Sequence, residues 1–185
     1  MSRIGVNALY LIPGGVGGTE IYLRNLLAAL AEIDRTNQYF VFTNRETGTD
    51  LVPVQGNFLE DPQPVRASFR PARILWEQCR LPFVVKRRQL DVLLNPGFTG
   101  PLFCPCPQVT VFHDLQHKRH PEYFRWFDLP FWNFFLWASA RRSRGLIAVS
   151  EATREDLQRY YGVNAQVIHH GVEREFFEIA KGREP

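Results

Sequence analysis

The chain has 185 residues, of which 45% are hydrophobic, a share typical of a globular protein and not of an intrinsically disordered one. A net charge of +3, with no run of more than three lysines or arginines, argues against a nucleic-acid-binding protein. Three cysteines without regular spacing favour a reducing compartment over a disulfide-linked scaffold.

The first half of the chain begins with a strand–helix–strand pattern. Residues 4–8 form a short apolar run that predicts a buried strand, and a glycine-rich loop follows at residues 14–18. A helix is expected next, with an apolar face made of Ile21, Tyr22, Leu26, Leu27, Leu30 and Ile33. Residues 39–43 predict a second strand, and four prolines limit residues 44–72 to short elements.

The second half of the chain continues the alternation of strands and helices. Residues 73–88 are expected to form a helix that is kinked or divided at Pro82. Further strands are predicted at residues 91–95, 108–112, 145–149 and 165–168, and further helices at residues 128–142 and 151–161. The alternation predicts a Rossmann-like, doubly wound α/β fold, in which a mainly parallel sheet carries helices on both faces.

The two ends of the chain suggest how the protein is divided into domains and in which compartment it resides. We assign residues 1–170 to one domain and expect the polar residues 171–185 to begin a linker toward a second domain that this chain lacks. The N-terminus enters a strand directly, so no signal peptide is expected. No apolar run approaches the roughly 20 residues that cross a bilayer, and a cytoplasmic location is predicted.

Ligands of open parallel sheets bind beyond the C-terminal ends of the strands. A first candidate at this edge is the loop at residues 14–18, because its glycines let the backbone approach an anion near Thr19, where the next helix begins. The loop is neither a Walker sequence nor a complete dinucleotide-binding fingerprint. A flexible turn without a ligand is the alternative interpretation.

Two more candidates follow later strands. His113 comes directly after strand 108–112 and next to Asp114, where an imidazole can be oriented for hydrogen bonding or proton transfer. The alternative is a structural role, in which Asp114 caps the next segment. Ser150 precedes the helix at 151–161 and is predicted to be its N-cap, which by itself would explain the residue.

A zinc site is an alternative use of Cys104, Cys106, His113, His117 and His120. One residue separates the two cysteines, whereas paired zinc cysteines are usually separated by about two to four. Buried loop thiols and surface imidazoles are therefore the preferred interpretation, and no metal site is predicted.

The stretch that begins at Phe124 and ends at Trp137 is aromatic at eight of its 14 positions. Arginines follow at positions 141, 142 and 144. An aromatic helix face that ends in cations is typical of a peripheral contact with a membrane surface, here the inner face of the membrane. The alternative is a helix packed against the sheet and a partner domain. We prefer packing, because Asp128 and Asn133 interrupt the apolar surface.

Four segments together resemble the N-terminal domain of the family 4 (group 1) retaining glycosyltransferases, which have two facing Rossmann-like domains in the GT-B arrangement. The segments are residues 17–20, 111–115, 148–153 and 167–173, and they occur in the family's order over nearly the whole chain. The resemblance implies one half of a GT-B architecture, with a C-terminal donor-binding domain missing from this chain.

The resemblance also implies an activity and a set of contacts. The complete enzyme would move a sugar, with retention, from a nucleotide-sugar donor to a glycan, lipid or small-molecule acceptor, without a cofactor or metal. Gly17 and Gly18 would approach the donor diphosphate, and His113 would contact the donor sugar. Thr19 and Ser150 are further candidates for donor contacts. The missing domain would bind the nucleotide, so this chain alone is predicted to be inactive.

Two other functions are compatible with the predicted fold. One is a non-catalytic ligand-binding or interaction domain, which needs no second domain. The other is half of a nucleotide-sugar epimerase, which would need acid and base carboxylates in the cleft, where Asp114 is the clear candidate for a catalytic carboxylate. The four segments favour the glycosyltransferase and specify neither its acceptor nor its donor sugar.

Overall fold

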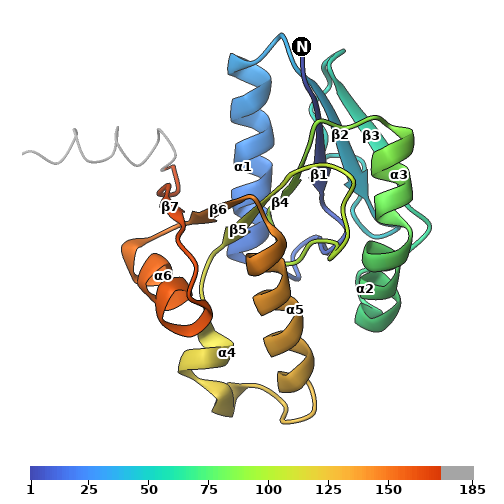
Figure 1. Cartoon of the computed structure of the whole chain (residues 1–185). Coiled ribbons are helices and arrows are strands. Elements are labelled where there is room, and N and C mark those ends of the chain that lie inside the picture. Colours follow the sequence, from blue (N-terminus) through green and yellow to red (C-terminus); the bar gives the residue numbers. More distant parts are fainter. Residues whose placement is uncertain (172–185) are drawn as a thin grey trace, which may run out of the picture.

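In the computed structural model, which describes residues 1–171, seven parallel strands form one sheet in the order β3-β2-β1-β4-β5-β6-β7 (Figure 1). The strands are β1 (Arg3–Asn7), β2 (Gln38–Thr43), β3 (Phe58–Pro62), β4 (Val92–Asn95), β5 (Gln108–Phe112), β6 (Gly145–Ala148) and β7 (Gln166–Val167). The helices are α1 (Gly18–Ile33), α2 (Arg70–Cys79), α3 (Leu81–Arg87), α4 (Gln116–Arg119), α5 (Leu129–Arg142) and α6 (Glu151–Asp156). The doubly wound α/β fold is thereby confirmed. Nearly all of the expected linker, residues 172–185, lies outside the described residues.

The order of the strands creates a switch point in the middle of the sheet. β1 lies between β2 and β4, and Val6 is in register with Val41 on one side and Leu94 on the other. The chain leaves β1 through α1 toward β2, but it leaves β4 toward β5, in the opposite direction. Such a reversal opens a crevice beyond the C-terminal ends of the two strands, which is where ligands of this fold class bind.

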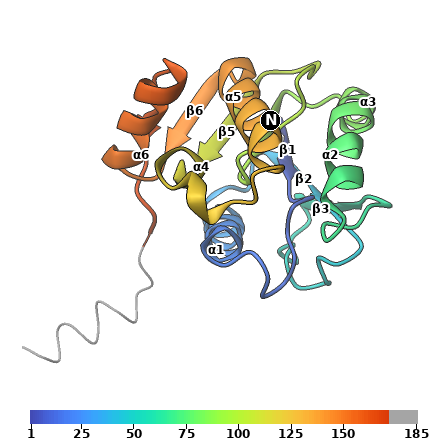
Figure 2. The same cartoon turned by 90° about the horizontal axis from the view of Figure 1, so that it is seen from below.

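Helices cover both faces of the sheet (Figure 2). On one face α1 packs through Leu23 and Leu27 against strand residues such as Val6 and Val41. The opposite face of the sheet carries two hydrophobic clusters. One lies beneath α3, and the other lies beneath α5 and the segment that follows α6. Members of these two clusters include Phe40, Phe42, Leu81, Val85 and Leu93 in the first, and Phe112, Leu136, Ala140, Leu146 and Leu157 in the second.

The apolar face predicted for the first helix was correct at Leu27 and Leu30 but wrong at Ile21 and Ile33. The buried residues of α1 are Leu23, Leu27 and Ala31, at a spacing of four. Ile21 is 59% exposed and Ile33, in the last turn, is 78% exposed. Ile21 projects from the side of the helix opposite Leu23, because residues two apart are separated by more than half a turn. A single apolar residue on an amphipathic helix therefore does not show which side of the helix faces the sheet.

Other differences from the sequence-based expectations are local. The helix expected at 73–88 is divided into α2 and α3, and Pro82 lies in the first turn of α3, where its missing N–H costs no helical hydrogen bond. The helix expected at 151–161 changes to a π-type turn (Leu157–Tyr161) after α6 and ends at Gly162, which has a φ of 64°. Helix α4 and a 3₁₀ turn (Pro121–Tyr123) were not predicted.

Helix α5 packs on the sheet, but most of its aromatic side chains do not. The residues buried beneath it are Leu136, Ala138, Ser139 and Ala140, whose small side chains allow close approach. Trp126 before the helix is 81% exposed, and Phe134 and Trp137 on its outer side are 50% and 43% exposed. The packing of the helix on the sheet is thus confirmed, and these rings are left for the second contact, with a membrane or with a partner domain. Among the helices of residues 1–171, none combines the length and apolar character that a bilayer-spanning segment needs.

Candidate functional site

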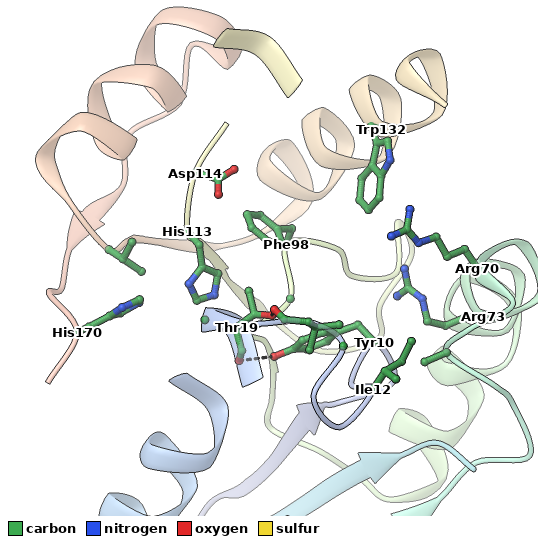
Figure 3. A pocket seen from close by; sticks show the side chains of 16 residues that line it. Tyr10, Ile12, Thr19, Arg70, Arg73, Phe98, His113, Asp114, Trp132 and His170 are labelled. Atoms are coloured by element: carbon green, nitrogen blue, oxygen red, sulfur yellow. Dashed lines mark hydrogen bonds between the residues drawn. The ribbon is translucent and has the colours of Figure 1, made fainter. Parts of the chain in front are cut away.

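A pocket of about 500 Å³ lies beyond the C-terminal ends of β1, β4, β5 and β6, beside the switch point (Figure 3). Its lining comes from segments far apart in the chain: Tyr10, Ile12, Gly15, Val16, Gly18, Thr19, Ala67, Arg70, Arg73, Gly97, Phe98, His113, Asp114, Trp132, Val149 and His170. His113 and His170 lie at one end, and the two arginines and Trp132 at the other. The parallel topology thus brings the glycine loop and the strand-end histidine to one place.

The glycine loop has a shape that other residues would not readily adopt. Gly17 has a φ of 57° and a ψ of −131°, outside the regions that L-residues populate. A side chain built at Gly17 or Gly18 would meet nothing within 4 Å, so both positions border open space. Glu20 braces the loop, because its Oε2 accepts the Gly14 N–H at 2.8 Å while its Oε1 pairs with Arg24 at 2.9 Å. The loop is a fixed structure whose backbone is open to a ligand.

Different effects are therefore expected for the two glycines. Gly17→Ala should destabilise the domain by about 1–3 kcal/mol, because alanine must hold a positive φ. Gly18→Ala, at the start of α1, should be near neutral, since its surroundings are empty. Urea denaturation of the chain measures both effects. A Gly17→Ala domain as stable as the Gly18→Ala domain would show that the positive φ at Gly17 is not required by the fold.

His113 is the histidine that reaches the pocket directly from the sheet. Its ring is half-buried, and its Nε2–H donates a hydrogen bond to the Pro96 carbonyl, 2.9 Å away, at the end of β4. The Tyr22 ring packs against it at 5.0 Å and the Phe98 ring at 5.2 Å, both edge-on. The His170 ring lies 5.4 Å away. The imidazole is therefore held in one orientation.

The electrostatic surroundings of His113 keep the ring neutral. Burial lowers its pKa, and the bond to Pro96 opposes this effect in part. Since a carbonyl oxygen only accepts hydrogen bonds, the proton of the neutral ring resides on Nε2 and the lone pair on Nδ1. Nδ1 has no hydrogen-bond partner in residues 1–171. The ring can therefore accept a hydrogen bond from a hydroxyl group, in an environment that disfavours protonation.

A buried polar network supports the floor of the pocket. Glu77 of α2 is 1% exposed and accepts from Arg73 at 3.3 Å, from Asn7 of β1 at 3.2 Å and from Thr99 at 3.2 Å. Asn7 also donates to Asn95 of β4 at 3.1 Å. The network connects α2 to the two strands at the switch point and to the loop after β4. Buried charges of this kind persist when each polar atom is paired.

Comparison with known proteins assigns the fold to a family. A sequence model described as Glycosyltransferase Family 4 matches residues 16–176. The chain belongs to glycosyltransferase family 4. The matched region is the N-terminal domain of such enzymes, as the four segments predicted. A search of curated proteins gives no significant match to this family 4 domain.

Two solved structures resemble the family 4 domain. One, described as the lipopolysaccharide outer core galactosyltransferase WaaB in its apo form, matches 92% of this chain and 46% of its own with a TM-score of 0.52 and 11% identity. A glycosyltransferase from Rickettsia africae ESF-5 matches 97% of this chain and 45% of its own with a TM-score of 0.52 and 16% identity. The likeness shows the fold, a Rossmann-like half of the GT-B architecture. The chain spans slightly less than half of either protein.

Asp114 and Ser150 have structural partners in this family 4 domain. Asp114 lines the pocket, but its Oδ1 accepts the Gln116 N–H at 3.1 Å at the start of α4, so it caps the next segment and does not orient the His113 ring. Ser150 caps α6 by accepting the Thr153 N–H at 3.2 Å. The Thr153 hydroxyl donates to the His113 carbonyl at 3.0 Å. The segment at 148–153 thus fixes the backbone of His113.

Thr19 is also engaged, because its hydroxyl donates to the Val16 carbonyl at 2.9 Å and its own carbonyl accepts from the Tyr10 hydroxyl at 3.2 Å. Sequence reasoning missed Tyr10, which is partly buried and whose pKa is raised mainly by that burial. It also missed Phe98, which has a φ of 69°. A positive φ at a non-glycine residue beside a pocket is typical of functional sites, and the Pro96–Gly97 pair was the available signal.

The alternative zinc set is scattered in the domain. The Cys104 and Cys106 sulfurs are 3.8 Å apart in their loop. His117 bonds the Tyr161 hydroxyl at 2.7 Å, and burial lowers its pKa to about 4. His120 pairs with Glu122 on the surface. Among residues 1–171, no three His, Cys, Asp or Glu side chains are grouped as a metal site.

Proposed function

We propose that this family 4 domain is the acceptor-side half of a retaining glycosyltransferase that takes its sugar from a nucleotide-sugar donor, with a hexose as the expected sugar. One observation carries the proposal: the imidazole of His113, held by the Pro96 carbonyl, lies in the same pocket as the open glycine loop at the switch point of the sheet. The loop offers backbone groups at the N-terminus of α1 to a diphosphate. His113 Nδ1 offers an acceptor to a sugar hydroxyl.

In the proposed reaction this domain positions the donor and does not supply a base. His113 would hold the sugar in a reactive orientation through Nδ1, while Gly17 and Gly18 approach the leaving diphosphate. Positioning and charge stabilisation of this kind account for a large share of enzymatic rate enhancement. We propose that a C-terminal domain binds the nucleotide and completes the diphosphate site, and that neither a metal nor another cofactor takes part.

The rival functions differ in their requirements. An epimerase would need two carboxylates at the reacting carbon, whereas within residues 1–171 Asp114 is the one acidic residue that lines the pocket, and its Oδ1 is engaged by the Gln116 N–H. A non-catalytic binding domain would bind a nucleotide sugar without transferring it. Incubating the complete protein with nucleotide sugars and candidate acceptors decides between transfer, epimerisation and simple binding.

The proposal predicts that the 185 residues fold but transfer no sugar by themselves, since the proposed nucleotide-binding domain is not among them. Circular dichroism should show a cooperative thermal transition, and a nucleotide-release assay should remain at background with each nucleotide sugar tested. The matched control is the complete protein under the same conditions. Transfer above background by the chain alone would contradict the proposal that a second domain is needed to bind the nucleotide.

We also propose a cytoplasmic protein that contacts the membrane peripherally through the exposed rings around α5. Trp126 and Trp137 project outward, and Arg125 lies in the same segment, where it can approach anionic headgroups. The chain is expected to sediment with anionic vesicles at low salt, and less so at high salt. Trp126→Ala combined with Trp137→Ala should abolish sedimentation, whereas Phe83→Ala, on α3, is the control. Absence of sedimentation would favour a partner domain over these rings.

A further inference from the structure

A groove between α2 and α5 continues the pocket at the end opposite His113. We call it the arginine–aromatic groove and define it by Arg70, Arg73, Arg125, Phe127, Phe131 and Trp132. Its volume is about 420 Å³, and it shares Arg70, Arg73 and Trp132 with the pocket. Figure 3 shows the two guanidinium groups and the Trp132 ring turned toward the same space. A ligand in the pocket could therefore extend into the groove without a break.

The groove has an excess of positive charge. The Arg73 side chain is 6% exposed and pairs with Glu77, but that carboxylate is shared with Asn7 and Thr99. Burial lowers the pKa of Arg73, and the nearby charge of Arg70 lowers it further. Within residues 1–171, neither Arg70 nor Arg125 takes part in a salt bridge, and Asp128 is the one acidic residue that lines the groove. Two neighbouring guanidinium groups, of which Arg73 is paired with a carboxylate and Arg70 is not, are suited to bind an anion.

The opposite wall of the groove is apolar and exposed. Phe127, two residues before α5, is 56% exposed, and Phe131, in the first turn of α5, is 37% exposed; both line the groove. The Arg70 guanidinium lies 5.5 Å from the centre of the Trp132 ring, which fixes the arginine at the boundary between the pocket and the aromatic wall. Phe134 and Trp137 continue the exposed aromatic surface along α5. Cations are thus placed between the reaction pocket and an apolar surface.

We propose that the arginine–aromatic groove is the acceptor subsite, and that the acceptor is an amphiphile with a phosphate group between its sugar-accepting end and its apolar chain. The inference rests on the proposed function, since it assigns the acceptor of that transfer. The phosphate would bind Arg70 and Arg73. The apolar chain would lie along Phe127 and Phe131, and the accepting hydroxyl would reach the pocket beside His113. A phosphate accepts charge-assisted hydrogen bonds from both guanidinium groups at once, whereas a neutral sugar has no negative charge to offset theirs.

Calorimetry with the isolated chain tests the subsite without any sugar transfer. The probes are n-octyl phosphate, n-octyl glucoside and inorganic phosphate, each below its micellar concentration where one exists. We expect n-octyl phosphate to bind at least about tenfold more tightly than the other two, because a charge-assisted hydrogen bond and a buried chain each contribute about a factor of ten. Arg70→Gln should weaken binding of n-octyl phosphate about tenfold, and Phe131→Ser by a similar factor.

The controls separate this inference from misfolding and from the proposed function. Arg87→Gln, an exposed arginine at the end of α3, should leave binding unchanged, and thermal unfolding should show every variant folded. Equal binding of n-octyl phosphate and n-octyl glucoside would overturn the anion subsite, and equal binding of inorganic phosphate would overturn the amphiphile. Because no donor is present, these results stand whether or not the complete protein transfers a sugar.

Discussion

Replacing His113 by alanine is expected to lower kcat of the proposed complete transferase by about 100-fold, the usual effect of removing one preorganised hydrogen-bonding group from an active site. The domain should stay folded. The ring is half-buried, and its Nε2–H makes one hydrogen bond, to Pro96, which contributes about 1 kcal/mol. Steady-state kinetics with saturating donor, together with urea denaturation of the isolated chain, measure the two effects separately.

The matched control is His120→Ala, a histidine that pairs with Glu122 on the surface outside the pocket. Its kcat and KM should equal those of the unmodified enzyme. Near-normal kcat in His113→Ala would remove the proposed role of the ring, even though its position in the pocket is observed. A loss of folding in His113→Ala would instead indicate that the ring mainly holds β4 and β5 together through Pro96.

The lowered pKa of His113 predicts how kcat depends on pH if the ring has this role. Above that pKa the ring is neutral and Nδ1 accepts a hydrogen bond, whereas below it both nitrogens donate and the acceptor is lost. If this ring limits activity, kcat should hold as the pH falls through 6.5, the ordinary value for histidine, and decline only at lower pH. This decline of kcat at low pH should be absent in His113→Ala.

Glu77→Ala is expected to be the most destabilising single substitution that we predict, at about 3–5 kcal/mol, because it leaves the buried Arg73 charge without its counterion. It also leaves Asn7 and Thr99 without an acceptor. Such a loss is a large part of the 5–15 kcal/mol that typically separates folded and unfolded domains, and it should lower Tm by roughly 10 °C. Thermal and urea denaturation of the chain test it.

Leu75→Ala is the control on the same helix, since Leu75 is 64% exposed and its truncation should cost little. Arg73→Met combined with Glu77→Met should regain part of the loss, because removing both charges avoids an unpaired one. A Glu77→Ala domain as stable as Leu75→Ala would show that the network beneath the pocket is solvated and does not support it.

The sequence was sufficient to predict the fold and the position of His113, for a common reason. Strand and helix patterns are encoded locally, and a parallel sheet necessarily brings the C-terminal ends of its strands to one edge. The glycine loop and His113 follow two such strands, so their meeting in the pocket could be anticipated. The same reasoning correctly predicted Ser150 as the N-cap of α6, but it could not decide on a donor contact there, because a good N-cap and a ligand contact look alike in sequence.

Only the tertiary structure shows which side chains reach the pocket from distant parts of the chain. Arg70 and Arg73 come from α2, which reaches the pocket through the connection between β3 and β4, and Trp132 comes from α5, more than 50 residues later. The Pro96 carbonyl that orients His113 belongs to the neighbouring strand end. No local periodicity encodes such pairings, because they are selected by the packing of whole helices on the sheet. The sequence by itself therefore determined which strand ends could hold a site, and packing determined which distant side chains complete it.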